Sequence, residues 1–163
     1  PFVRIVAETA LASGLDPVIV VVGANEEIIA KVLYGLPVKI VRNHTWEQGQ
    51  STSIHTGLKL LPEDIGGAIF LLVDQPQIPQ TLVRALMERH HQTMHPIIAP
   101  LIEGQRGNPV LFDRDTFADL LKISGDVGGR AIFPMYSIDW VDWIGQNLLI
   151  DIDTISDYHN FRS

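Results

Sequence analysis

Residues 68–73 read AIFLLV, and the polar triplet Asp74-Gln75-Pro76 follows them directly. A short run that is apolar at every position is typical of a strand buried on both faces, as in a parallel sheet. A second run of this kind, PVIVVV at residues 17–22, ends at Gly23. Both runs therefore predict central strands of a sheet.

Helical patterns separate these strands. Apolar residues recur at helical spacing from Val3 to Leu11, and Ser13-Gly14 is typical of a helix end. Later segments repeat the alternation without a linker, a low-complexity tract or an internal repeat, and Leu148–Ile152 reads as a last strand. Alternation of this kind requires right-handed crossovers. We therefore expect an α/β protein with a three-layer, mostly parallel sheet, in which residues 1–163 form one domain.

The composition narrows the class of protein. The sequence has 163 residues, of which 46% are hydrophobic and 19% charged, so it is expected to fold around a sizeable core. Its net charge of −7 argues against nucleic acid as a partner, since binding a phosphate backbone needs a basic face. No apolar run is long enough to span a membrane, and the absence of cysteine fits a cytoplasmic location.

Asp74 is the first candidate for a functional residue. In open parallel sheets, ligands bind beyond the carboxyl ends of the strands, and Asp74 directly follows a predicted central strand. A carboxylate in that position commonly holds Mg²⁺ against ligand phosphates. The alternative is an ordinary turn aspartate, which the position alone leaves equally open.

A second acidic pair follows the last apolar run. Strand alternation places Asp151 and Asp153 on one face, with Ile152 on the other. Two such carboxylates repel each other and are costly if buried without a cation, but for the pair taken alone exposure to solvent is the favoured explanation.

Three loops carry further candidates. Gly49 in the segment Trp46–Ser51 could permit close approach of a ligand, and Ser51 or Ser53 could bind it or cap a helix. Arg106-Gly107-Asn108-Pro109 precedes a predicted strand and is a further candidate, although Gly-Asn-Pro is also simply a common turn sequence. The turn Gly125–Gly129, with Asp126 inside it and Arg130 after it, would suit an anion, although flexibility alone would explain its glycines.

Other chemistries find no support in the sequence. His91 and His95 have helical spacing but no nearby third metal ligand. The sequence contains no Gly-x-Ser-x-Gly motif, no cysteine nucleophile, and no Walker or Gly-x-Gly-x-x-Gly motif.

Taken together, the motifs resemble one family. Six of them occur in the order seen in molybdenum cofactor cytidylyltransferases, a branch of the sugar-phosphate-type nucleotidyltransferases with a Rossmann-like fold. They are Pro1–Gly23, Asn43-x-x-Trp46-x-x-Gly49-x-x-x-Ser53, Asp74-Gln75-Pro76, Gly107-Asn108-Pro109, Gly125-Asp126-x-Gly128-x-Arg130 and Asp151-Ile152-Asp153-Thr154.

The resemblance implies transfer of a cytidylyl group from CTP to molybdopterin, with release of pyrophosphate. It implies that Asp74 holds Mg²⁺, with Asp153 or Asp151 as the second carboxylate. It further implies a nucleotide site, an acceptor site, and a molybdoenzyme as a candidate recipient of the cofactor. The nucleotide site would comprise Gly49, Ser51, Ser53 and Asp74, and the acceptor site Gln75, Pro76, Gly107, Asn108, Asp126 and Arg130.

Members of the resembled family begin with a strand and a glycine-rich loop that wraps the triphosphate, and Pro1 matches a position just after that segment. We therefore expect a chain truncated at its N-terminus, without the first strand and phosphate loop, and inactive or nearly so by itself. Three alternatives remain open: a guanylyl- or sugar-nucleotidyltransferase, a non-catalytic cofactor-binding accessory protein, and a plain structural α/β domain.

Overall fold

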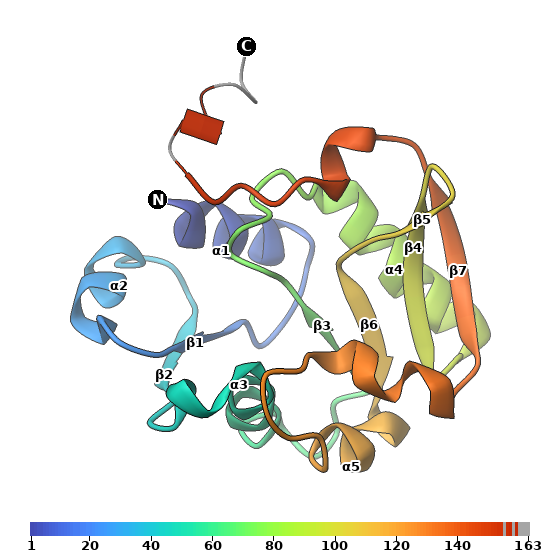
Figure 1. Cartoon of the computed structure of the whole chain (residues 1–163), viewed down its shortest axis with the longest axis horizontal. Helices are drawn as coiled ribbons and strands as arrows, with labels where there is room; N and C mark the ends of the chain where they lie inside the picture. Colours follow the sequence, from blue (N-terminus) through green and yellow to red (C-terminus); the bar gives the residue numbers. More distant parts are fainter. Residues whose placement is uncertain (155, 158, 160–163) are drawn as a thin grey trace.

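The computed structural model describes residues 1–154, 156, 157 and 159. Helices and strands alternate from Phe2 to Ile102, as predicted (Figure 1), and two further strands then follow without a helix between them. The helices are α1 (Phe2–Ala12), α2 (Glu26–Val32), α3 (Gln50–Leu58), α4 (Gln80–Thr93) and α5 (Phe117–Leu120). The strands are β1 (Ile19–Val22), β2 (Lys39–Arg42), β3 (Gly67–Phe70), β4 (Ile97–Ile102), β5 (Gln105–Arg106), β6 (Val110–Asp113) and β7 (Ile138–Trp143). Four short 3₁₀ turns complete the set: η1 (Trp46–Gln48), η2 (Arg114–Thr116), η3 (Gly129–Met135) and η4 (Gln146–Leu149).

The strands form two sheets. β1 and β2 pair in parallel, and the second sheet has the order β3-β6-β4-β5, with β7 parallel to β4. β6 is antiparallel to both β3 and β4, so β3, β4 and β7 run in one direction. The second sheet is thus mixed, because the chain turns back at the β4–β5 hairpin and enters β6 without a crossover helix.

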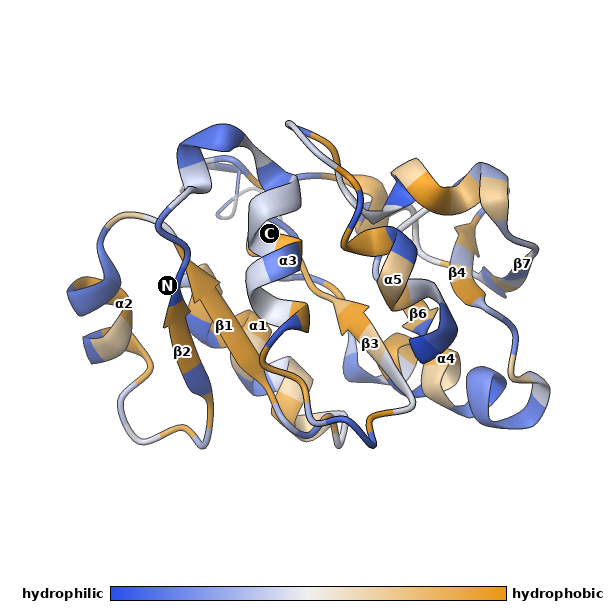
Figure 2. Ribbon diagram, turned by 90° about the horizontal axis from the view of Figure 1, so that it is seen from below, coloured by the Kyte–Doolittle hydropathy of each residue, from blue (hydrophilic) through white to orange (hydrophobic). Residues whose placement is uncertain are grey.

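An apolar cavity of about 620 Å³ separates the two sheets, and residues of both β1 and β3 line it. No strand of the described residues lies between β1 and β3. Helices α1 and α3 approach the cavity from opposite faces, since Val20 packs in the cluster of α1 while Val21 contacts Gly57 of α3 (Figure 2). Most residues of β1 are therefore only half-buried where the sequence predicted a fully buried strand.

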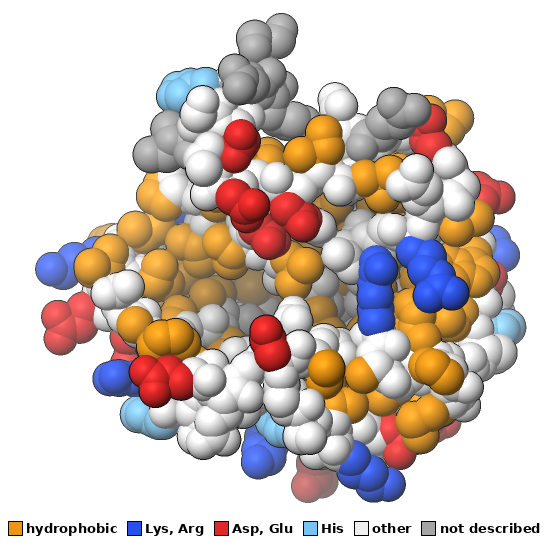
Figure 3. Space-filling view, in the orientation of Figure 1, with side chains coloured by type: hydrophobic (Ala, Val, Ile, Leu, Met, Phe, Trp, Pro, Cys, Tyr) orange, Lys and Arg blue, Asp and Glu red, His pale blue; other side chains and the backbone are white. Residues whose placement is uncertain are grey.

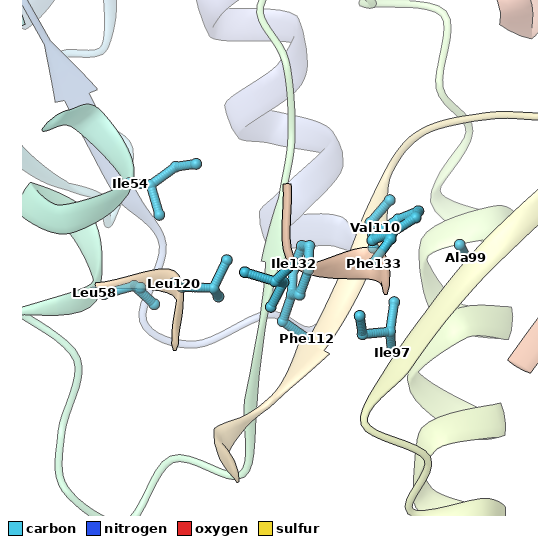
Figure 4. Packing of buried hydrophobic residues seen from close by; sticks show 9 residues of the cluster. All are labelled: Ile54, Leu58, Ile97, Ala99, Val110, Phe112, Leu120, Ile132 and Phe133. Carbon is cyan, nitrogen blue, oxygen red and sulfur yellow. The ribbon is translucent and has the colours of Figure 1, made fainter. Parts of the chain in front are cut away.

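The mixed sheet has an apolar cluster on each face. α4 covers one face, and α3, α5 and η3 cover the other. Neighbours on a strand belong to different clusters: Leu111 packs toward α4, while Phe112 packs toward η3, as expected from strand alternation (Figure 4). The Phe112 ring lies 5.2 Å from that of Phe70 and 6.3 Å from that of Phe133, centroid to centroid. This stack fixes β3, β6 and η3 relative to one another.

A polar contact ties α4 to the end of β6. Nε2 of His90 lies 2.6 Å from Oδ2 of Asp113, and the other carboxylate oxygen accepts a hydrogen bond of 2.8 Å from the Asp115 amide at the start of η2. We expect Asp113→Ala to lower the free energy of unfolding by about 1–2 kcal/mol, because it removes a helix cap and leaves a partly buried imidazole unpaired. Urea denaturation would measure this.

Glu8→Ala serves as the control, since it removes only the exposed i,i+4 pair with Arg4 and should cost less than about 0.5 kcal/mol. Equal losses in the two variants would show that the His90–Asp113 contact contributes nothing beyond an ordinary surface pair.

The prediction of a strand at Leu148–Ile152 was wrong. η4 ends at Leu149, and residues 150–153 pair with no strand of the described chain. The alternation in burial is nevertheless present, because Ile152 is buried and Asp151 and Asp153 are exposed. A loop lying along an apolar surface produces the same pattern as a half-buried strand, so sequence periodicity alone does not distinguish them. Among the described residues, no helix is long and apolar enough to cross a membrane.

Candidate functional site

The candidate site lies at the loop that follows β3. Asp74 comes four residues after the end of the strand, and its carbonyl oxygen accepts a hydrogen bond of 2.7 Å from the amide of Ile152. Ile152 is only 2% exposed and anchors the segment that carries the second acidic pair. This single backbone contact joins positions 78 residues apart, and it brings together two motifs that the sequence placed near one site.

Three carboxylates gather at this contact. Burial raises the pKa of Asp74, the nearby Asp151 raises it further, and Asp153 adds a smaller effect of the same sign. Oδ1 of Asp74 is buried and accepts no hydrogen bond from any described residue. A hollow beside it is lined by Asp74, Asp153 and apolar neighbours. Clustered negative charge with an unpaired buried oxygen is an arrangement that a bound cation would stabilise.

Gln75 holds one of these carboxylates in place. The side chain is buried, and its Nε2 donates a hydrogen bond of 2.6 Å to Oδ1 of Asp151. Gln77, which the sequence reasoning missed, donates from Nε2 to the backbone oxygens of Ile150 and Asn147. No motif marks Gln77 in the sequence, because its partners are backbone atoms that only the fold brings near. Pro76 is buried in the same loop.

The carboxylates fit a cation that takes few ligands from the protein. Within the described ranges, no group of three or more His, Asp or Glu side chains converges on one point as a complete metal cage would require. Mg²⁺, however, is usually held by one or two carboxylates, with water and substrate phosphates supplying the remaining oxygens. Asp74, with Asp153 beside the same hollow, meets that smaller requirement.

Two of the predicted loops are joined to each other. The hydroxyl of Ser51 donates a hydrogen bond of 2.7 Å to the carbonyl of Gly125, and the amide of Gln50 donates to Asp126 at 3.3 Å. Gly49 has φ = 114°, and a Cβ added there would lie 2.4 Å from the Gly125 oxygen. The described contacts of Ser51 and Asp126 are thus to protein groups, and their roles in ligand binding stay predictions.

Ser53 contacts the segment after β2 instead of the Gly125 turn. Its hydroxyl accepts a hydrogen bond of 3.0 Å from Nδ2 of Asn43, a buried side chain that also donates to Thr52. Ser53 also lines the large cavity, together with Gln50. Asn43 therefore fixes the start of α3 against the end of β2.

The third predicted loop lies against Arg130. Nη2 of Arg130 donates to the carbonyl oxygen of Gly107 at 3.0 Å and to Oδ1 of Asn108 at 3.4 Å. Burial lowers the pKa of Arg130, and the neighbouring cation Arg106 lowers it further. Asn108 and Arg130 both line the large cavity, which shares Leu72 and Val73 with the hollow beside Asp74. Each sequence-predicted segment thus contributes at least one residue to the lining of one of these two spaces.

Acidic and basic side chains lie on different sides of this hollowed surface (Figure 3). Figure 3 shows acidic side chains gathered on one rim of a hollowed, partly apolar surface, with basic side chains on another side of it. Such a layout places negative and positive charge on different sides of the hollow (Figure 3). It suits a ligand that carries both a metal-bound phosphate and further negative charge.

The sequence model of the MobA-like NTP transferase domain matches residues 1–139. The chain belongs to this family. It is accordingly a nucleotidyltransferase-like enzyme. The match includes Asp74 and Arg130 and ends before Asp151, so it does not extend to the second acidic pair.

A curated relative and several solved structures resemble the chain. Nicotine blue oxidoreductase of Paenarthrobacter nicotinovorans is 28% identical over 160 residues, which cover 91% of this chain and 76% of that protein. Rv0371c of Mycobacterium tuberculosis superposes with a TM-score of 0.81 at 21% identity, covering 98% of this chain and 83% of that one. A nucleotidyl transferase of Methanothermobacter thermautotroptrophicus gives 0.80 at 20% identity, covering 99% and 78%. These structures confirm the predicted α/β nucleotidyltransferase fold, and Rv0371c has also been solved in complex with manganese.

Proposed function

We propose that the protein transfers a cytidylyl group from CTP to a molybdopterin-type acceptor, with Mg²⁺ bound at Asp74. The observation that carries this proposal is the buried, unpaired carboxylate oxygen of Asp74 beside Asp151 and Asp153, in a hollow that Asp74 lines together with Asp153. The family supplies the reaction type. The choice of CTP and of molybdopterin rests on the motif resemblance described above.

The reaction needs positioning and charge neutralisation, and it needs no protein nucleophile. An oxygen of the acceptor's terminal phosphate attacks the α-phosphorus of CTP. A new O–P bond forms as the bond to the β-phosphate oxygen breaks, and pyrophosphate leaves with that electron pair. Bound Mg²⁺ would neutralise charge on the triphosphate.

Residues of the chain have separate tasks in this scheme. Asp74 and Asp153 would hold the cation, while Gln75 keeps Asp151 beside them through its hydrogen bond. Gly49 and Ser53 would approach the nucleoside, and Asn108 and Arg130 would face the acceptor across the cavity. The product would then pass to a molybdoenzyme.

Calorimetry with CTP and GTP in the presence of Mg²⁺ tests the proposal. We expect CTP to bind at least about tenfold more tightly than GTP. A site whose polar groups form hydrogen bonds with one base rejects another base that leaves those groups unpaired. Tighter binding of GTP would replace the cytidylyl assignment with a guanylyl one. Absence of binding by both nucleotides, repeated with the N-terminal strand and glycine-rich loop of the resembled family added to the chain, would count against transferase activity. In that case the relative named an oxidoreductase would direct the next assay to redox chemistry.

A further inference from the structure

Two arginines form none of the ion pairs of the described residues: Arg130, which lines the large cavity, and Arg106 in the neighbouring hairpin. Arg106 lies on the exposed β5, and its guanidinium carbon sits 5.6 Å from the centroid of the Trp140 ring. Neither Arg106 nor Arg130 forms a salt bridge with any acidic side chain among the described residues. By contrast, Arg89 pairs with Asp139 through two hydrogen bonds.

The loop that follows Arg106 holds the Arg130 side chain by a hydrogen bond. Arg130 bonds to the carbonyl oxygen of Gly107, the residue next to Arg106. Burial lowers the pKa of Arg130, and repulsion from Arg106 adds to the effect. A Cβ at Gly107 would lie 2.4 Å from Cδ1 of Ile102, so this loop packs directly against β4. Two like charges fixed next to each other cost free energy unless an anion binds between them.

We infer that Arg106 and Arg130 form an anion site that holds the phosphate group of the acceptor substrate. This inference rests on the proposed function, since the acceptor is the reactant that must face the nucleotide from the opposite rim. The carboxylates of Asp74 and Asp153 mark the rim where a cation and the nucleotide phosphates belong. Guanidinium groups bind phosphate oxygens in pairs, with hydrogen-bond geometry that an ammonium group does not match.

Both arginine side chains are held in place before a ligand binds. Stacking on Trp140 restricts the long side chain of Arg106, which lowers the entropy lost when it binds a ligand. Arg130 is fixed by its two hydrogen bonds and keeps its remaining N–H groups for a ligand. The sequence placed Arg106 and Arg130 in two separate loops, and only the tertiary structure relates them, through the bond from Arg130 to Gly107.

Orthophosphate binding to the full chain tests the site. The titration would be followed by ³¹P NMR at low ionic strength, with EDTA present so that the carboxylates hold no metal. We expect Arg106→Gln and Arg130→Gln each to weaken phosphate binding about tenfold, and Arg106→Lys, which keeps the charge, to lose less than about threefold. Arg89→Gln is the matched control, with the same change of charge outside the cavity, and should bind like the wild type.

The outcomes separate the inference from the proposed function. Equal phosphate affinity in Arg106→Gln, Arg89→Gln and the wild type would overturn the anion site, and because Arg106 is exposed, its variant should fold. Losses of CTP affinity in Mg²⁺ as large as the losses of phosphate affinity would also overturn it, since the arginines would then hold the nucleotide. Failure of the proposed function looks different: the wild type would not bind CTP at all, whatever its affinity for orthophosphate.

Discussion

Asp74→Asn is expected to weaken Mg²⁺-dependent CTP binding by about 100-fold, while the same change makes the metal-free protein more stable. An asparagine keeps the shape of the side chain and its burial, but it removes the charge that a cation needs. Loss of a hydrogen-bonded or metal-bound charge typically costs a few kcal/mol, which corresponds to this change in affinity. Calorimetry with CTP and Mg²⁺ would measure the loss.

The gain in stability follows from the raised pKa of Asp74. Burial and the neighbouring carboxylates raise that pKa above 3.8, so the folded protein keeps the proton to higher pH than the unfolded chain does. The free energy of unfolding therefore falls as pH rises from about 3.8 through the raised pKa, and it stays lower above it. The Asp74→Asn variant would carry no such penalty, so in EDTA at neutral pH its Tm should exceed that of the wild type by about 1–3 °C.

Two comparisons complete this experiment. Asp64→Asn is the control, because Asp64 is exposed in the turn before β3 and should change neither CTP affinity nor Tm. Below about pH 3, where the carboxyl group is mostly protonated in both the folded and the unfolded chain, Asp74→Asn should match the wild type. A variant that binds CTP normally in Mg²⁺ would remove Asp74 from the metal site.

Gly49→Ala is expected to destabilise the fold by about 3–5 kcal/mol, the largest effect of any single methyl group in the loops. Gly49 has φ = 114° and ψ = 173°, a conformation that is open essentially to glycine alone. The added Cβ would also lie 2.4–2.6 Å from backbone atoms of Gly125 and Asp126, which no side-chain rotation can relieve. The loop before α3 would have to separate from the Gly125 turn.

Gly125→Ala is the matched control. Gly125 has φ = 80°, but its Cβ would meet nothing within 4 Å, so the substitution carries the backbone strain without the collision. We expect it to cost about 1 kcal/mol. Thermal denaturation should lower Tm by roughly 10 °C for Gly49→Ala and by only about 2–4 °C for Gly125→Ala. Similar shifts in the two proteins would mean that the loops separate easily and that their contact contributes little.

The order of the elements could be predicted from the sequence because it depends on local periodicity. Continuous apolar runs marked β1 and β3, and helical spacing marked α1. The direction of β6 could not be predicted, since the turn at residues 103–104 decides it and both directions bury the same residues. The segment at Leu148–Ile152 was misassigned for a related reason, because burial alternates in a loop that follows an apolar surface as it does in a strand.

The sequence by itself also determined which residue types could carry the chemistry: carboxylates after a strand and in the final segment, and an arginine after a glycine-rich turn. Only the tertiary structure decided which of them meet. The backbone hydrogen bond from Ile152 to Asp74 brings the carboxylates of the two segments together. The hydrogen bond from Arg130 to Gly107 brings Arg130 to the loop that follows Arg106. Periodicity reports the face on which a residue lies, but distances between segments far apart in the chain depend on how sheets, turns and helices pack, and that information is not local.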